Sequence, residues 1–195
     1  NYIDLPIQHI NDKILEAMGR KTKGSHIRRL IERLRREIPN ISIRTSLIVG
    51  FPGETDDQFG ELLEFMQDVE FDRLGAFKYS KEEGTMAATF PNQVPEETKE
   101  ERYHRLMEVQ NGIAVKLNRG LVGAATKVLI EGLSDDNDVV GGQPALMKGR
   151  TPCQAPDKLF QYFITKGKAV PGEMHDLLIT GVNAYDLIGE IISIP

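Results

Sequence analysis

The chain has 195 residues, of which 24 are Lys or Arg and 29 are Asp or Glu, so its formal net charge is −5. This length allows one large domain or two small ones, and the acidic balance argues against unspecific nucleic-acid binding as the main purpose. The single cysteine, Cys153, excludes an internal disulfide and any site that needs several cysteines of this chain.

No apolar run reaches the about 20 residues that a membrane span needs. The first residues also lack the basic and apolar regions of a signal peptide. We therefore expect a cytoplasmic protein without a membrane partner. Because no methionine starts the chain and a strand-like segment begins at residue 2, we expect a piece that begins inside a domain.

Strand and helix signals alternate from the start of the chain. The segment "YIDLPI" predicts a short strand, and "NDKILEAMGR" predicts a helix with Asn11 as its N-cap. The next helix, "GSHIRRLIERLRREIP", has apolar residues at helical spacing, with Ser25 as its expected N-cap and Pro39 as its stop. The strand "SIRTSLIVG" ends in an apolar run, which is typical of a parallel strand buried on both faces.

A turn rich in glycine, "GFPGET", follows this strand. Thr55 and Gln58 then predict a capping box for another helix, and "RLGAFKYS" predicts a third strand. Alternating strands and helices with short connections predict βαβ units and a parallel sheet.

Polar or glycine-rich segments follow all three predicted strands. Gln8 and His9 follow the first, residues 50–54 the second, and Tyr79 and Ser80 the third. Ligands of parallel sheets gather beyond the carboxyl ends of the strands, so we expect a binding site at this edge. No Lys-Ser or Lys-Thr pair follows the turn, so it is not a Walker loop. It is either a tight turn or a place where the backbone approaches a flat ligand.

Arg44 interrupts an otherwise apolar strand. An arginine that points into a barrel needs a carboxylate partner, and Asp4, Glu54 or a ligand are the alternatives. The arginines between residues 28 and 36 predict a helix face exposed to solvent. We expect Cys153 to serve only in packing.

The second half of the chain begins with a long helix, predicted over residues 95–120. Its packed face is marked by Leu106, Val109, Ile113 and Leu117. After it, five short segments separated by Gly, Pro, Asp and Asn predict a small five-stranded antiparallel barrel of the OB type. The fold class is thus α/β plus all-β, with one domain over residues 1–123 and another over residues 124–195.

Three long stretches resemble the radical S-adenosylmethionine methylthiotransferases. They are "YIDLPIQHINDKILEAMGRKT", "RTSLIVGFPGET" and "FKYSKEEGTMAATFPNQVPEETKEERYHRLMEVQ", and residues 124–195 resemble the TRAM domain that ends those enzymes. The RimO branch carries "D-x-P-x-QH" and "GRT…AP", which fit residues 4–9 and 149–156, although the stretch after Pro156 departs from the pattern. The resemblance implies a partial parallel (β/α) radical SAM barrel and a TRAM barrel.

The RimO resemblance implies a transferase that adds a methylthio group to the β-carbon of an aspartate in small-subunit ribosomal protein number twelve. It implies S-adenosylmethionine and two [4Fe–4S] clusters in the full-length protein. The cysteines that bind the clusters are not in this chain, so we expect the fragment alone to be inactive. A tRNA methylthiotransferase of the MiaB type and a non-catalytic RNA-binding TRAM module are the alternatives.

The family's pattern also implies cofactor-binding residues. Ile48 and Val49 would contact the adenine of S-adenosylmethionine, and Gly50 would allow its close approach. From strand-end position rather than from the family's pattern, we expect the ribose or the methionine carboxylate to lie near Gln8, His9 and Arg44. Tyr79 and Ser80 would border the same cavity. No metal ligand and no catalytic residue are assigned.

The predicted barrel domain is acidic, with six Lys and Arg against nine Asp and Glu over residues 124–195. Three of its acids, Asp135, Asp136 and Asp138, lie in one loop. An RNA-binding barrel should be basic. We therefore expect the TRAM domain to bind the basic ribosomal protein rather than tRNA, and we expect a monomer.

Overall fold

A computed structural model describes residues 1–135, 138–154, 161–183 and 185–192. Its backbone contacts divide the chain into two units between Ile113 and Ala114, inside one long helix. The predicted domain boundary after residue 123 lies a short distance beyond this division and stays a prediction. The two units are described separately below.

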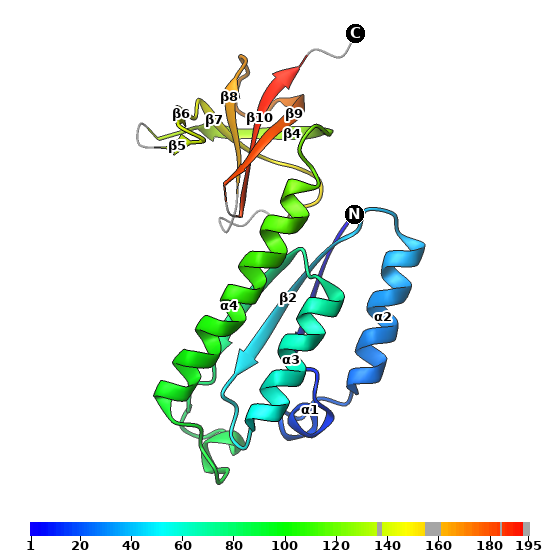
Figure 1. Ribbon diagram of the computed structural model, residues 1–195, viewed down its shortest axis with the longest axis vertical. Helices are drawn as coiled ribbons and strands as arrows, with labels where there is room; N and C mark the ends of the chain where they lie inside the picture. Colours follow the sequence, from blue (N-terminus) through cyan, green and yellow to red (C-terminus); the bar gives the residue numbers. More distant parts are fainter. Residues whose placement is uncertain (136–137, 155–160, 184, 193–195) are drawn as a thin grey trace. The chain divides into compact units, whose positions relative to one another are not determined.

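The first unit is a small sheet with helices (Figure 1). Its elements are β1 (Tyr2–Gln8), α1 (Asp12–Ala17), α2 (Gly24–Glu37), β2 (Ser42–Val49), α3 (Asp56–Val69), β3 (Arg73–Lys78), the short 3-10 helix η1 (Met86–Thr89) and the part of α4 (Glu96–Arg119) up to Ile113. The strands are ordered β1-β2-β3. Strands β2 and β3 are parallel, with Arg44 opposite Arg73 and Val49 opposite Lys78. The predicted parallel sheet with helices is therefore confirmed.

The side chains of strand β2 show how the helices pack against this sheet. Every second residue is fully buried among the helices, and the residues between them are half-buried on the other face. The buried residues are Ile43, Thr45, Leu47 and Val49. Helix α3 adds its own stripe of buried residues, Phe59, Leu62, Phe65 and Met66. This alternation fixes which β2 side chains are free to meet a ligand.

The start of α2 differs from the prediction. The helix begins at Gly24, and its N-cap is Lys23, whose side chain makes no capping hydrogen bond. Ser25 is therefore not the cap. The N–H of Gly24 instead donates to Oδ1 of Asp12 at 2.8 Å, so a carboxylate from α1 satisfies the helix end.

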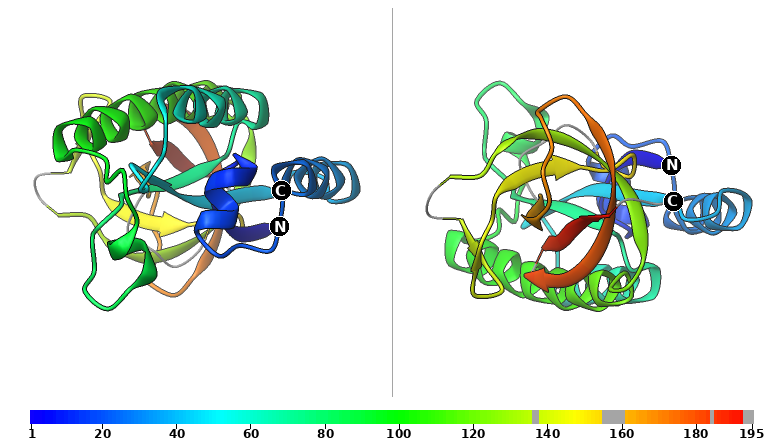
Figure 2. Two further views of the ribbon diagram at one scale, coloured as in Figure 1. Left: turned by 90° about the horizontal axis from the view of Figure 1, so that it is seen from below. Right: turned by 90° about the horizontal axis from the view of Figure 1, so that it is seen from above.

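The second unit contains a closed five-stranded barrel and a two-stranded hairpin (Figure 2). Its strands are β4 (Ala125–Leu133), β5 (Val139–Val140), β6 (Gln143–Pro144), β7 (Met147–Arg150), β8 (Tyr162–Lys166), β9 (Met174–Asn183) and β10 (Asp186–Ile192). The barrel order is β10-β8-β7-β4-β9, and β5 pairs with β6. The predicted five-stranded barrel is confirmed.

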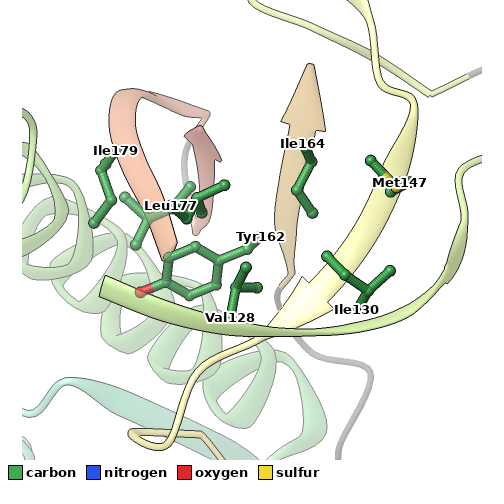
Figure 3. Packing of buried hydrophobic residues seen from close by; sticks show 8 residues of the cluster. Val128, Ile130, Met147, Tyr162, Ile164, Leu177 and Ile179 are labelled. Carbon is green, nitrogen blue, oxygen red and sulfur yellow. The ribbon is translucent and has the colours of Figure 1, made fainter. Parts of the chain in front are cut away.

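All five barrel strands contribute to one apolar core, seen in Figure 3. Its buried residues are Val128, Ile130, Met147, Tyr162, Ile164, Leu177, Ile179 and Leu187. Val128 and Ile130 are two apart along β4, as are Leu177 and Ile179 along β9, which is the period of a strand with one face in a core.

One strand pairing corrects the expectation of an antiparallel barrel. Strands β8 and β10 run parallel, with Leu187 opposite Tyr162, whereas the other four pairings of the ring are antiparallel. The reason is geometric. A closed ring of alternating strand directions needs an even number of strands, so a ring of five must contain a parallel pair.

Candidate functional site

A cavity of about 510 Å³ lies at the carboxyl ends of the first unit's strands. This volume is within the range of small-molecule sites. Its lining residues are Gln8, Glu16, Ala17, Met18, Gly19, Arg20, Ile48, Phe51, Tyr79, Met86, Ala87 and Phe90. They come from the ends of all three strands, from the segment that ends α1, and from the segment around η1.

Aromatic rings form one wall of this cavity. The ring of Phe51 packs edge-on against Tyr79, with centroids 5.2 Å apart, and against Phe90, with centroids 6.2 Å apart. Ile48 adds an aliphatic side chain. The polar groups of the lining include Gln8, Glu16 and Arg20. The cavity thus combines an apolar, largely aromatic wall with an amide and both signs of charge.

The structure brings three of the predicted site residues together. Gln8, Ile48 and Tyr79 come from three different strand ends and all line the cavity. The backbone of Gln8 is left-handed, with φ 71°, where β1 ends. This is an unusual conformation for a residue other than glycine.

Val49 and Gly50 do not line the cavity. Val49 is fully buried on the helix side of β2, because adjacent side chains of a strand point to opposite faces. Gly50 faces α4: a Cβ at this position would lie 2.3 Å from Cγ of Lys99. Gly50 therefore allows the close approach of the aliphatic part of the Lys99 side chain. Val49 and Gly50 pack against the helices and do not face the cavity.

His9 is fully buried beside the cavity rather than in its lining. Its Nδ1 accepts a hydrogen bond from the backbone N–H of Asn11 at 3.0 Å, which places the ring proton on Nε2. Nε2 has no hydrogen-bond partner among the residues the structure describes. Burial, and second the positive charge of Arg102, lower the pKa of His9 to about 4. His9 is therefore a neutral imidazole at pH 7.

Arg44 and Ser80 also lie outside the lining. Among the alternatives for Arg44, Asp4 is an observed partner, with Nη1 to Oδ2 at 2.5 Å. Ser80 is exposed and donates its hydroxyl to Oε1 of Glu82 at 2.7 Å. A ligand contact of Arg44 or Ser80 stays a prediction.

The turn that carries Phe51 is fixed by a buried carboxylate. Oε2 of Glu54 accepts the backbone N–H groups of Gly50, at 2.6 Å, and Phe51, at 3.1 Å. Nη1 of Arg102 lies 3.3 Å from Oε1 of Glu54 and donates to its backbone carbonyl at 3.1 Å. Burial raises the pKa of Glu54, while Arg102 and the two N–H groups act against this rise.

Sequence reasoning missed the polar residues of α4 that face this turn. Lys99 and Arg102 are both buried, and with Leu106 they follow the helical spacing of three and four residues. Only the apolar members of the stripe were assigned to the packed face. A signal was available, because Lys99 and Arg102 extend the spacing of Leu106 toward the start of the helix.

No group of three or more His, Cys, Asp or Glu side chains that could hold a metal ion occurs within the described parts of the chain. Cys153 is half-buried in the second unit. The residues of this chain therefore do not fit an iron–sulfur cluster, which takes several thiolates. Over the described residues, no helix has the length and apolarity that crossing a membrane requires.

A segment in each unit is similar to a known protein family. Residues 1–66 match the Radical SAM superfamily, and residues 122–192 match the TRAM domain. The chain is 51% identical to the ribosomal protein uS12 methylthiotransferase RimO of Geobacter sulfurreducens and 51% identical to that of Citrifermentans bemidjiense. The predicted resemblance to the RimO type is confirmed.

These RimO relatives cover nearly all of this chain but are much longer. The Geobacter sulfurreducens protein aligns with 98% of the chain and 42% of its own length. The RimO protein of Geotalea uraniireducens is 49% identical, over 98% of the chain and 41% of its own length. The chain therefore spans less than half the length of these relatives.

Proposed function

We propose that this chain is part of a radical SAM methylthiotransferase that adds a methylthio group to the β-carbon of an aspartate in ribosomal protein uS12. The observation that carries the proposal is the cavity at the strand ends, with its wall of Phe51 and Tyr79. The similarity to RimO proteins over 98% of the chain supports the same reaction and substrate.

The cavity suits S-adenosylmethionine in chemistry as well as in volume. The flat adenine would lie against the aromatic wall and Ile48, where apolar contact replaces water. The amide of Gln8 would hydrogen-bond the ribose or the base. Arg20 would face the carboxylate of the methionine part, and Glu16 would face its ammonium group. Each of these two lining residues carries the charge opposite to that of its group.

The radical chemistry itself comes from the cofactors, since S-adenosylmethionine beside a reduced iron–sulfur cluster supplies a 5′-deoxyadenosyl radical that abstracts hydrogen. This chain would bind and orient the sulfonium compound and keep water away from it. The proposal places the ligands of two [4Fe–4S] clusters outside this chain. It includes a cytoplasmic, monomeric enzyme whose TRAM domain binds uS12.

The test measures S-adenosylmethionine binding to the full-length protein with its clusters reconstituted under anaerobic conditions. Ile48→Asp should weaken binding at least tenfold, because it buries a charge against the adenine. The matched control is Leu30→Asp, since Leu30 is 47% exposed on α2 and does not line the cavity. Wild-type affinity in a folded Ile48→Asp variant would refute the cofactor site.

A second measurement tests the reaction. The full-length protein with reconstituted clusters is incubated with uS12, S-adenosylmethionine, sulfide and a reductant, and the uS12 peptides are analysed by mass spectrometry. We expect one aspartate to gain a methylthio group in place of a hydrogen. Modification of tRNA, with none of uS12, would instead support the MiaB alternative.

A further inference from the structure

We propose that Arg102 and Glu54 are positioning residues: their buried ion pair sets the turn that carries the aromatic wall of the cavity. This inference rests on the proposed function, because it assigns the two residues a role in cofactor binding. Neither residue lines the cavity, and they come from elements far apart in the sequence.

The first step is that Glu54 hydrogen-bonds the backbone of the turn. Gly50 and Phe51 are both buried, so their N–H groups need partners inside the protein. One carboxylate oxygen, Oε2 of Glu54, accepts both. A carboxylate that accepts two backbone N–H groups fixes the path of the chain between them. The orientation of the Phe51 ring depends on that path.

The second step is that Arg102 binds Glu54 through an ion pair and a hydrogen bond. The side chain of Glu54 is 0% exposed and that of Arg102 is 6% exposed. The guanidinium donates to the carbonyl of Glu54, lies near its carboxylate, and donates from Nη2 to Asp56 at 2.7 Å. A planar fork can reach these three acceptors at once, whereas a lysine ammonium is a single point of charge.

The third step leads from the turn to the cavity wall. The ring of Phe51 contacts both Tyr79 and Phe90 edge-on. The N–H of Gly53 donates to the carbonyl of Asn92 at 2.9 Å, which ties the same turn to the segment that carries Phe90. A displaced turn would therefore shift two of the three rings. Displacement by about 1 Å is enough to weaken a preorganised site severely.

The experiment uses the full-length reconstituted protein and measures two quantities. One is the dissociation constant of S-adenosylmethionine. The other is the hydrogen-exchange rate of the backbone amides of residues 50 and 51, which reports the turn without any ligand. The variants are Arg102→Lys, Arg102→Met, Glu54→Gln and the double variant. The control is Arg105→Met, because Arg105 also lies over the Phe59 ring but is half exposed.

Arg102→Lys keeps the charge and should keep the thermal midpoint near that of the wild type. We expect it to weaken cofactor binding about tenfold and to speed exchange at the two amides by a similar factor, because the fork is lost. Arg102→Met and Glu54→Gln should have larger effects. The double variant should bind S-adenosylmethionine no more weakly than the single variant with the lower affinity, because the two residues act as one unit. Arg105→Met should match the wild type in both measurements.

Each other result overturns part of the proposal. If Arg102→Lys binds the cofactor and exchanges its amides like the wild type, Arg102 is not a positioning residue. If its amides exchange faster while binding is unchanged, the turn does not set the site. If the wild-type protein binds no S-adenosylmethionine, the proposed function fails, and slow exchange that depends on Arg102 would then show the ion pair to be purely structural.

Discussion

The buried imidazole of His9 should make the stability of the first unit depend on pH. The pKa is about 4 in the folded chain and 6.5 in the unfolded chain, so between these values only the unfolded chain takes up the proton. Stability should therefore fall as pH is lowered from 6.5 toward 4, by about 2 kcal/mol at pH 5 from this residue.

Urea unfolding of the chain at pH 7 and pH 5 measures this effect. His9→Gln keeps an acceptor for the Asn11 N–H and should lose less stability between the two pH values than the wild type. Glu54 has a raised pKa and contributes with the opposite sign, but it is present in both proteins and cancels. His26→Gln, at an exposed position, is the control. Equal losses in the wild type and His9→Gln would contradict the prediction.

Gly50 and Gly53 form a matched pair within one turn. Both have a left-handed backbone, with φ 73° and 83°, which costs any other residue about 1 kcal/mol or more. Only Gly50 also lies against Lys99, while nothing lies within 4 Å of a Cβ at Gly53. Gly50→Ala should therefore destabilise the chain by about 1–3 kcal/mol more than Gly53→Ala in urea unfolding. Equal losses would show that the lysine stem moves aside freely.

Among the elements, α4 contacts the rest of the first unit through polar as well as apolar side chains. Gln110 is fully buried, and its Nε2 donates to the backbone carbonyl of Phe71 at 2.9 Å. Gln110→Leu would leave this carbonyl unpaired and should lower stability by about 1–3 kcal/mol. The neighbouring Asn111→Leu, at an exposed position, should have little effect. Thermal unfolding of both variants provides the comparison.

The elements also show how far sequence reasoning reaches. The strand ends and the long helix were predicted because short-range patterns encode them, and so was the Thr55–Gln58 capping box, which the structure contains. The direction of each β2 side chain follows from the same period of two, although the prediction grouped Ile48 with Val49. The partner of Glu54 was beyond reach, because Arg102 lies 48 residues away and no local pattern joins them.

At the scale of the whole molecule, the cysteine count leads to a prediction about clusters. One thiolate cannot satisfy the several ligand positions of an iron–sulfur cluster, so the isolated 195-residue chain should bind none. Anaerobic reconstitution followed by iron analysis and visible absorbance measures this. A stoichiometric cluster on monomeric chain would contradict it.

The charge of the second unit leads to a prediction about its partner. Asp135 is mostly exposed, while Asp138 is more buried, and both lie 2.8 Å from Nζ of Lys148; Asp136 lies outside the described residues. Asp135→Asn should thus remove surface charge with less effect on the loop than a change at Asp138. We expect it to slow association of the full-length protein with uS12 at low salt, and less so at high salt.

The same variant separates the two partner classes. Removing a negative charge should slightly strengthen attraction to the phosphates of tRNA, which is the opposite direction. Surface plasmon resonance with each partner at two salt concentrations measures both effects. Tight binding of tRNA to the wild type, with none of uS12, would contradict the assignment of the TRAM domain to a protein partner.

The parallel pairing of β8 with β10 affects how the barrel forms during translation. Strand β10 pairs with both β8 and β9, so the ring cannot close until it has been synthesised. Until then, a nascent chain that ends after β9 has two unpaired strand edges that another nascent chain can pair with. Strand β10 begins at Asp186, soon after β9 ends at Asn183, so at about 5–20 residues per second a ribosome completes it within about two seconds. The short β9–β10 connection therefore limits the time in which neighbouring chains on one messenger RNA can join through these edges.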